Sequence, residues 1–157
     1  MHERTCPCPR MLQYRPPRIA FSMLFAAGGL HLLLPQAWTT IGGLPAGGAL
    51  LAGLGLLVML RAWWLFRRHA TSICPTARTT TLITTDIYSF TRNPMYLGIV
   101  LMLLGIAVGS GGLFFYVAAL TYFLTIDHVF CPYEEEKLGR TFGPAFREYR
   151  RQVRRWL

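Results

Sequence analysis

The sequence predicts an all-α integral membrane protein with about four transmembrane helices. Three observations predict this fold. The chain of 157 residues is 53% apolar and only 15% charged, which is unusually apolar for a soluble domain. Its apolar residues gather in long blocks that contain almost no charge. Its basic residues lie at the ends of those blocks or between them, on the segments that four crossings would place on one side of a bilayer.

The predicted membrane helices span 19–38, 44–66, 95–109 and 112–130. The first two have the length of about 20 residues that a hydrocarbon core of roughly 30 Å requires. The apolar stretch after residue 94 is interrupted by Gly109-Ser110-Gly111-Gly112, so it predicts a short hairpin of two helices. A hairpin that does not cross the bilayer completely is the alternative.

The other segments are predicted to lie in the cytoplasm. Residues 1–18 form a proline-rich arm and residues 67–94 a loop. In residues 132–157 apolar side chains recur every three or four positions between Arg and Glu, which predicts an amphipathic helix with a basic face. Gly143-Pro144 is a point where this helix can break. Residues 19–157 are therefore interpreted as a single membrane domain.

The net charge of +9 could indicate nucleic-acid binding, but its distribution fits membrane topology. Both termini are predicted to be cytoplasmic, in the inner or cell membrane. Membrane lipid is the predicted partner and nucleic acid is not. Disulfides are not expected in the reducing cytoplasm. The Cys6-Pro7-Cys8-Pro9 run is too short for a zinc site, and we predict no metal.

Two charged motifs flank the predicted hairpin. Arg92-Asn93-Pro94-Met95-Tyr96-Leu97-Gly98 opens it, and Glu134-Glu135-Glu136 follows its second helix. The hairpin therefore brings one cation and several carboxylates to the same end. Charges in that position are costly unless they line a site or reach water. Arg92 as a plain boundary residue, and the glutamates as a solvated helix start, are the simpler alternatives.

Two blocks of this chain resemble signatures of the isoprenylcysteine carboxyl methyltransferase and phospholipid methyltransferase superfamily of integral membrane enzymes. The first block comprises Leu82, Thr84, Tyr88 and Arg92 to Gly98. The second comprises Glu134-Glu135, Leu138, Phe142-Gly143, Phe146, Tyr149, Val153 and Arg155-Trp156. The resemblance covers roughly residues 66–157. It implies S-adenosylmethionine as the cofactor, bound by the last two membrane helices and the C-terminal segment.

The resemblance also implies roles for individual residues. Arg92 and Glu134 are the expected catalytic residues. The expected cofactor-binding residues are Arg92, Asn93, Pro94, Tyr96, Leu97, Glu134, Glu135 and Tyr149. A guanidinium can bind a carboxylate through two hydrogen bonds, a glutamate can take an ammonium or a ribose hydroxyl, and an aromatic ring attracts a sulfonium. Which glutamate contacts the cofactor stays open, and a general base is needed only for a neutral acceptor.

The methyl acceptor is expected to be small or lipophilic: a prenylcysteine-like carboxylate, a phospholipid amine or a thiol. Glu134, Glu135 and His128 are the candidate bases for a neutral amine or thiol. Asp86 stands where the superfamily usually has glycine, so an additional acid could face the site. The alternative function is a non-catalytic membrane scaffold or lipid-binding protein of the same fold. A small transporter is a weaker alternative, because paired broken helices are missing from the sequence pattern.

Overall fold

The computed structural model describes residues 16–34, 41–68 and 81–157. All the regular elements in these residues are helices, and they contain no β-strand. The all-α prediction is therefore confirmed for this part of the chain. Residues 1–15, which make up most of the predicted arm of residues 1–18 and contain the Cys6-Pro7-Cys8-Pro9 run, lie outside the described residues.

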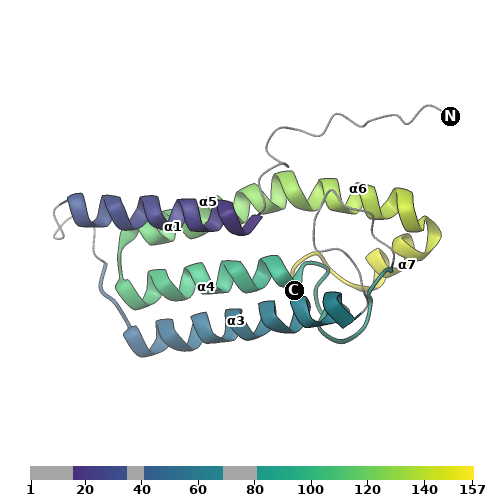
Figure 1. The fold of residues 1–157 in the computed structure, drawn as a ribbon, viewed down its shortest axis with the longest axis horizontal. Coiled ribbons are helices and arrows are strands. Elements are labelled where there is room, and N and C mark those ends of the chain that lie inside the picture. Colours follow the sequence, from purple (N-terminus) through teal and green to yellow (C-terminus); the bar gives the residue numbers. More distant parts are fainter. Residues whose placement is uncertain (1–15, 35–40, 69–80) are drawn as a thin grey trace.

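Four helices form an antiparallel bundle. They are α1 (Pro16–Leu33), α3 (Pro45–Arg68), α4 (Pro94–Ser110) and α5 (Leu113–Thr125). α4 lies between α3 and the pair formed by α1 and α5, and successive helices run in alternating directions (Figure 1). The start of α1, the end of α3 and the start of α4 therefore share one end of the bundle. That end carries the basic residues at these helix ends, Arg18, Arg67, Arg68 and Arg92.

Two helix boundaries in the structure differ from the bounds predicted for the membrane helices. The first helix begins at Pro16 and ends at Leu33, instead of covering 19–38. Proline suits the first turn of a helix, so the end of the predicted arm belongs to α1. The helix that begins at Leu113 continues beyond residue 130: α5 runs through the π-helical segment η3 (Ile126–Phe130) into α6 (Cys131–Phe142). Pro132 lacks a backbone N–H, and the π-helical segment directly before it lets the helix continue.

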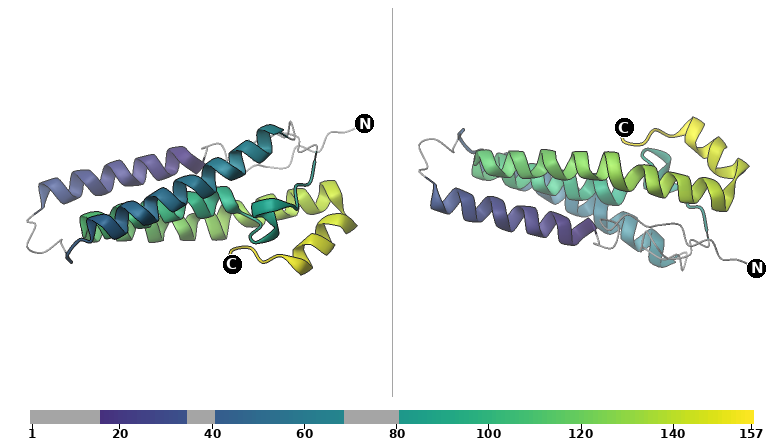
Figure 2. Two further views of the ribbon diagram at one scale, coloured as in Figure 1. Left: turned by 90° about the horizontal axis from the view of Figure 1, so that it is seen from below. Right: turned by 90° about the horizontal axis from the view of Figure 1, so that it is seen from above.

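The tail predicted for 132–157 consists of two helices, which are divided at the Gly143-Pro144 step where a break was expected. Gly143, at φ 51°, separates α6 from α7 (Pro144–Gln152). Glycine adopts such positive φ angles without a steric penalty. α7 then turns back along α6, and the chain end returns to the start of α4 (Figures 1 and 2). One face of α7 packs inward through Phe146 and Tyr149.

Helices α3 and α4 pack closely along glycines. A Cβ atom on Gly98 would lie 2.6 Å from the carbonyl oxygen of Gly55, and one on Gly105 would lie 2.4 Å from the backbone nitrogen of Ala52. Small residues allow helix backbones to approach in this way. Gly48 and Ala52 of α3 therefore face α4. A Cβ atom added to Gly53 would meet no other atom within 4 Å, so Gly53 takes no part in this contact.

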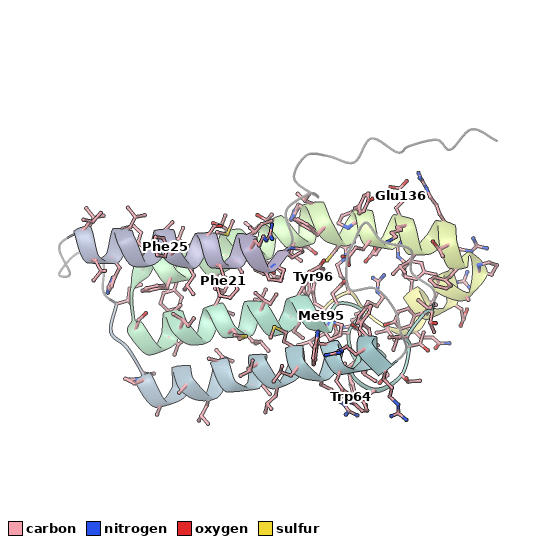
Figure 3. All side chains as sticks on the ribbon, in the orientation of Figure 1. Phe21, Phe25, Trp64, Met95, Tyr96 and Glu136 are labelled. Atoms are coloured by element: carbon pink, nitrogen blue, oxygen red, sulfur yellow. The ribbon has the colours of Figure 1, made fainter. Side chains whose placement is uncertain are left out.

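The outer surface of the bundle is strongly apolar. Phe21 and Phe25 on α1 are 72% and 86% exposed, and Leu50 on α3 is 77% exposed (Figure 3). Such extended apolar surfaces indicate contact with a membrane or a partner. Two described helices, α3 and the continuous rod Leu113–Phe142, are long and apolar enough to cross a bilayer, and α4 is a shorter apolar helix.

Candidate functional site

A cavity of about 140 Å³ lies at the end of the bundle where the basic helix ends meet. Its wall comes from the starts of α1 and α4, from the end of α3, from segment 81–93, from α6 and from α7. The polar lining is Thr81, Tyr88, Arg92, Asn93, Tyr96, Glu134 and Tyr149. The apolar lining includes Pro16, Phe66, Leu82, Ile83, Met95, Ile99 and Leu138. The hairpin thus brings both charged motifs of the sequence to one place.

Arg92 is held by the turn that precedes α4. Its backbone N–H donates to the carbonyl oxygen of Arg154 at 3.1 Å, so the returning chain end fixes this turn. Its side chain is only 10% exposed, and burial lowers the pKa of the guanidinium. Nη1 lies 3.0 Å from Oε1 of Glu135 without hydrogen-bond geometry. Among the described residues, neither Nε nor Nη1 of Arg92 has a hydrogen-bond partner.

Glu135 is engaged mainly by another arginine. Arg155 donates from Nε to Oε1 at 2.8 Å and from Nη2 to Oε2 at 3.1 Å, a two-pronged pair that raises the pKa of Arg155. Arg155 also donates to Oδ1 of Asp127 at 3.0 Å. Because Arg155 occupies both oxygens of Glu135, the ion pair with Arg92 leaves the Arg92 donors available. Glu135 itself does not line the cavity.

Glu134 does line the cavity, together with Tyr96. The Tyr96 hydroxyl donates to Oε1 of Glu134 at 2.5 Å, and in Figure 3 Tyr96 extends from α4 toward the α5–α6 rod. Glu134 lies beyond the apolar part of that rod. Burial raises the pKa of Glu134 to about 7. The carboxyl group can therefore gain or lose a proton near neutral pH.

Tyr149 closes the cavity from the side of α7. Its hydroxyl donates to the backbone carbonyl of Tyr88 at 2.7 Å, which joins α7 to segment 81–93. Burial raises the pKa of Tyr149 to about 12. Tyr88 sits in the short 3₁₀ helix η2 (Asp86–Ser89) and is itself buried. Tyr149 is also buried, at 6% exposure.

The other predicted cofactor residues divide into two groups. Asn93 is 9% exposed and lines the cavity, and its side chain lies 3.5 Å from the carbonyl oxygen of Arg155. Pro94 is buried at the first turn of α4 and shapes the turn without lining the cavity. Leu97 is not among the lining residues either. Because it lies one residue past Tyr96, Leu97 is rotated about 100° away around the helix.

Two ionisable residues that were candidates for the site, His128 and Asp86, do not line the cavity. His128, a candidate base, is 70% exposed, and its Nδ1 lies 3.1 Å from the carbonyl oxygen of Leu124. Asp86 pairs with Arg61 of α3 through both carboxylate oxygens, and this lowers the pKa of Asp86. Asp86 also has a φ of 60°, a conformation that favours glycine. The extra acid therefore serves the loop and does not face the site.

The roles of Arg155 and Tyr88 were missed by sequence reasoning. Both occur in the two signature blocks, which was the available signal, but neither had a predicted role. Arg155 lies 20 positions after Glu135, a separation from which no contact follows without the fold. Asp127, which had no predicted role either, accepts hydrogen bonds from Arg155 and from Nε1 of Trp156 at 2.9 Å.

Comparison with known proteins gave one match. The sequence model of the family described as phospholipid methyltransferase matches residues 45–145. This range includes α3, α4, the α5–α6 rod and both charged motifs. A search of curated proteins and a search of solved structures each gave no match.

Proposed function

This chain belongs to the phospholipid methyltransferase family, and we propose that it transfers a methyl group from S-adenosylmethionine to a small or lipophilic acceptor at the cytoplasmic face of a membrane. The main support for this proposal is the composition of the cavity. It combines the buried Arg92, which has hydrogen-bond donors without partners, with Glu134, whose pKa is raised to about 7. Perturbed, buried ionisable groups in a cavity are typical of functional sites.

The cavity residues fit the charged groups of this cofactor. The unpartnered Nε and Nη1 of Arg92 suit the cofactor's carboxylate, and Glu134 suits its ammonium group. The rings of Tyr88, Tyr96 and Tyr149 offer aromatic faces for the adenine or the sulfonium. The volume of about 140 Å³ is below the roughly 300–1,000 Å³ of ordinary small-molecule sites. Binding of the whole cofactor therefore requires the lining to open.

The proposed chemistry assigns binding and proton handling to this chain. When bound, S-adenosylmethionine supplies an electrophilic methyl group on a sulfonium. Arg92 and Glu134 hold the two charged ends, so that the methyl group and the acceptor are aligned. For an amine or thiol acceptor, Glu134 takes the proton released from nitrogen or sulfur, and a pKa near 7 suits that task. A carboxylate acceptor releases no proton and needs no base.

The apolar wall of the cavity supports a lipophilic acceptor. Pro16, Phe66, Met95 and Ile99 surround the polar groups, so a lipophilic chain can lie against them while its reactive group reaches Glu134. A prenylcysteine-like carboxylate, a phospholipid amine and a thiol all meet this description.

We also propose four membrane crossings, by α1, α3, α4 and the rod up to about Phe130. The alternating helix directions and the exposed apolar surface support this arrangement (Figure 1). Both termini then lie on the cytoplasmic side of the cell membrane, as the basic residues at that end favour. Helices α6 and α7 lie at the same side and cover the cavity.

Binding of S-adenosylhomocysteine to the purified protein in detergent tests the proposal by calorimetry. We expect Arg92→Ala and Glu134→Ala each to weaken binding more than tenfold, because each removes a charged contact. Glu136→Ala is the matched control. Its side chain points away from the bundle and pairs with Arg140, so affinity should change less than twofold (Figure 3).

Unchanged affinity in both site variants would disprove the site assignment. If the unaltered protein binds no S-adenosylhomocysteine, the alternative of a non-catalytic scaffold or lipid-binding protein of this fold is favoured instead.

A further inference from the structure

A second cavity lies on the other side of α6, between α6, α7 and the chain end. We call it the arginine groove. Its volume is about 550 Å³. Its lining residues are Pro132, Glu135, Glu136, Gly139, Arg140, Phe146, Arg147, Arg150 and Arg155. It shares none of these residues with the first cavity. The paired side chains of Arg92 and Glu135 stand between the two, since Arg92 lines one cavity and Glu135 lines the other.

The charges in the arginine groove do not balance. Both of its carboxylates are occupied: Glu135 by Arg155 at 2.8 Å, and Glu136 by Arg140 at 2.5 Å. Arg147 and Arg150 remain. Both are exposed, and neither has an ion-pair partner among the described residues. Two guanidinium groups without carboxylates thus project from one face of α7 into a space large enough for a ligand.

We propose that the arginine groove binds an anion carrying a phosphate group, held by Arg147 and Arg150. Guanidinium groups bind phosphate oxygens through paired hydrogen bonds. Phe146 and Gly139 also line the groove. Phosphate chemistry can come from an anionic lipid headgroup, because the groove begins at Pro132 near the proposed membrane face. It can also come from a soluble phosphorylated molecule.

The simplest competing explanation is that these arginines only add to the positive charge of the cytoplasmic side. A matched pair of double variants separates the two explanations. Arg147→Gln with Arg150→Gln removes the two groove cations. Arg151→Gln with Arg154→Gln removes the same charge from neighbouring exposed positions that do not line the groove. A general charge effect treats the two double variants alike, whereas a binding site does not.

The experiment is calorimetric titration of the full chain in an uncharged detergent. One arm uses pyrophosphate. The other uses short-chain phosphatidylglycerol, with short-chain phosphatidylcholine as the zwitterionic comparison. We expect at least one anion to bind, the groove variant to lose more than tenfold in affinity, and the control variant to lose less than threefold. Binding of pyrophosphate identifies a soluble ligand as sufficient, and binding of phosphatidylglycerol alone identifies a lipid headgroup.

Three results would overturn the proposal that the arginine groove binds a phosphate group. They are equal losses in both double variants, no binding of either anion by the unaltered protein, and phosphatidylcholine bound as tightly as phosphatidylglycerol. The affinity for S-adenosylhomocysteine, measured on the same samples, should stay within threefold in the groove variant. This second measurement also separates the arginine-groove proposal from the methyltransferase proposal, because a variant can lose anion binding while it keeps S-adenosylhomocysteine binding, or the reverse.

Discussion

At the scale of single residues, the site depends on how two arginine side chains share the carboxylate of Glu135. Arg155 donates two hydrogen bonds to Glu135, while Arg92 approaches the same carboxylate without hydrogen-bond geometry. A buried donor without a partner costs free energy. Its presence at the wall of a cavity therefore argues for a ligand that completes it. The fold keeps Arg92 charged beside Glu135 and leaves its donors free for an anion.

Glu134 gives the pH dependence of the protein. Its pKa is raised from 4.5 to about 7 in the folded state, so between these values the folded protein holds a proton that the unfolded chain has lost. Stability from this group is complete below about pH 4.5 and is lost as the pH rises through 7. We expect the free energy of unfolding to fall between pH 5 and 8 by at most about 3 kcal/mol.

Thermal unfolding in detergent at pH 5 to 8 measures this effect. Glu134→Gln should remove most of the pH dependence, because glutamine does not titrate. Glu136→Gln, at an exposed position, should leave it unchanged. The same pH profile in the protein and in Glu134→Gln would contradict the assignment of the titration to Glu134.

Asp86 stands at a position where the family resemblance leads us to expect glycine, and its side-chain contacts compensate for the difference. The left-handed conformation that glycine would adopt freely is imposed here on aspartate. Its carboxylate accepts a hydrogen bond from its neighbour's backbone N–H at 2.7 Å and pairs with Arg61. These contacts connect segment 81–93 to α3. The substitution therefore replaces backbone freedom with a side-chain contact.

At the scale of helices, the contact between α3 and α4 positions the Arg92 turn. Gly98 lies six residues after Arg92, and backbone atoms of α3 occupy the space where a side chain on Gly98 would lie. The two backbones can approach this closely only because both contribute glycine at the crossing.

Gly98→Ala should therefore destabilise the protein by about 1–3 kcal/mol, the usual range for overpacking. Gly53→Ala is the control on α3, because nothing lies within 4 Å of its added Cβ. That variant should be neutral or slightly more stable, since alanine favours helix over glycine. Thermal unfolding of both variants in detergent measures the difference. Equal melting temperatures would show that the α3–α4 contact is not as close as described.

At the scale of the whole molecule, one end of the bundle carries nearly everything polar. The starts of α1 and α4, the end of α3, and helices α6 and α7 meet there (Figure 2). The other end is formed by the tight turn between α4 and α5, where Gly111 adopts a φ of 68°. A bilayer around the apolar part would leave the polar end with its cavity and groove at one membrane face.

The concentration of polar residues at one end of the bundle predicts that this end, with the C-terminus, lies in the cytoplasm. A green fluorescent protein fused after Leu157 should fluoresce in a bacterial host, because this reporter folds in the cytoplasm. The same fusion after Gly111 should be dark, and alkaline phosphatase fused at the two positions should give the opposite pattern. Fluorescence at both positions would contradict the proposed crossing by α4 and would support a hairpin that enters the membrane without crossing it.

The sequence by itself determined the helical class, the hairpin and the family resemblance. Each of these follows from local patterns: apolar blocks, a glycine-rich turn, and two motifs that keep their internal spacing. It also predicted that Arg92 and the glutamates share one end of the hairpin, because an antiparallel hairpin leaves no other arrangement. The site roles of these residues stay predictions until binding is measured.

Only the tertiary structure decided how the charges pair. Glu134 and Glu135 are adjacent in sequence, but successive residues on a helix point in different directions. One therefore faces the cavity, and the other faces Arg155. The continuation of α5 into α6 and the return of the chain end to the Arg92 turn depend on contacts between distant segments. Local patterns do not encode such contacts, which is why Arg155 and the arginine groove emerged only from the fold.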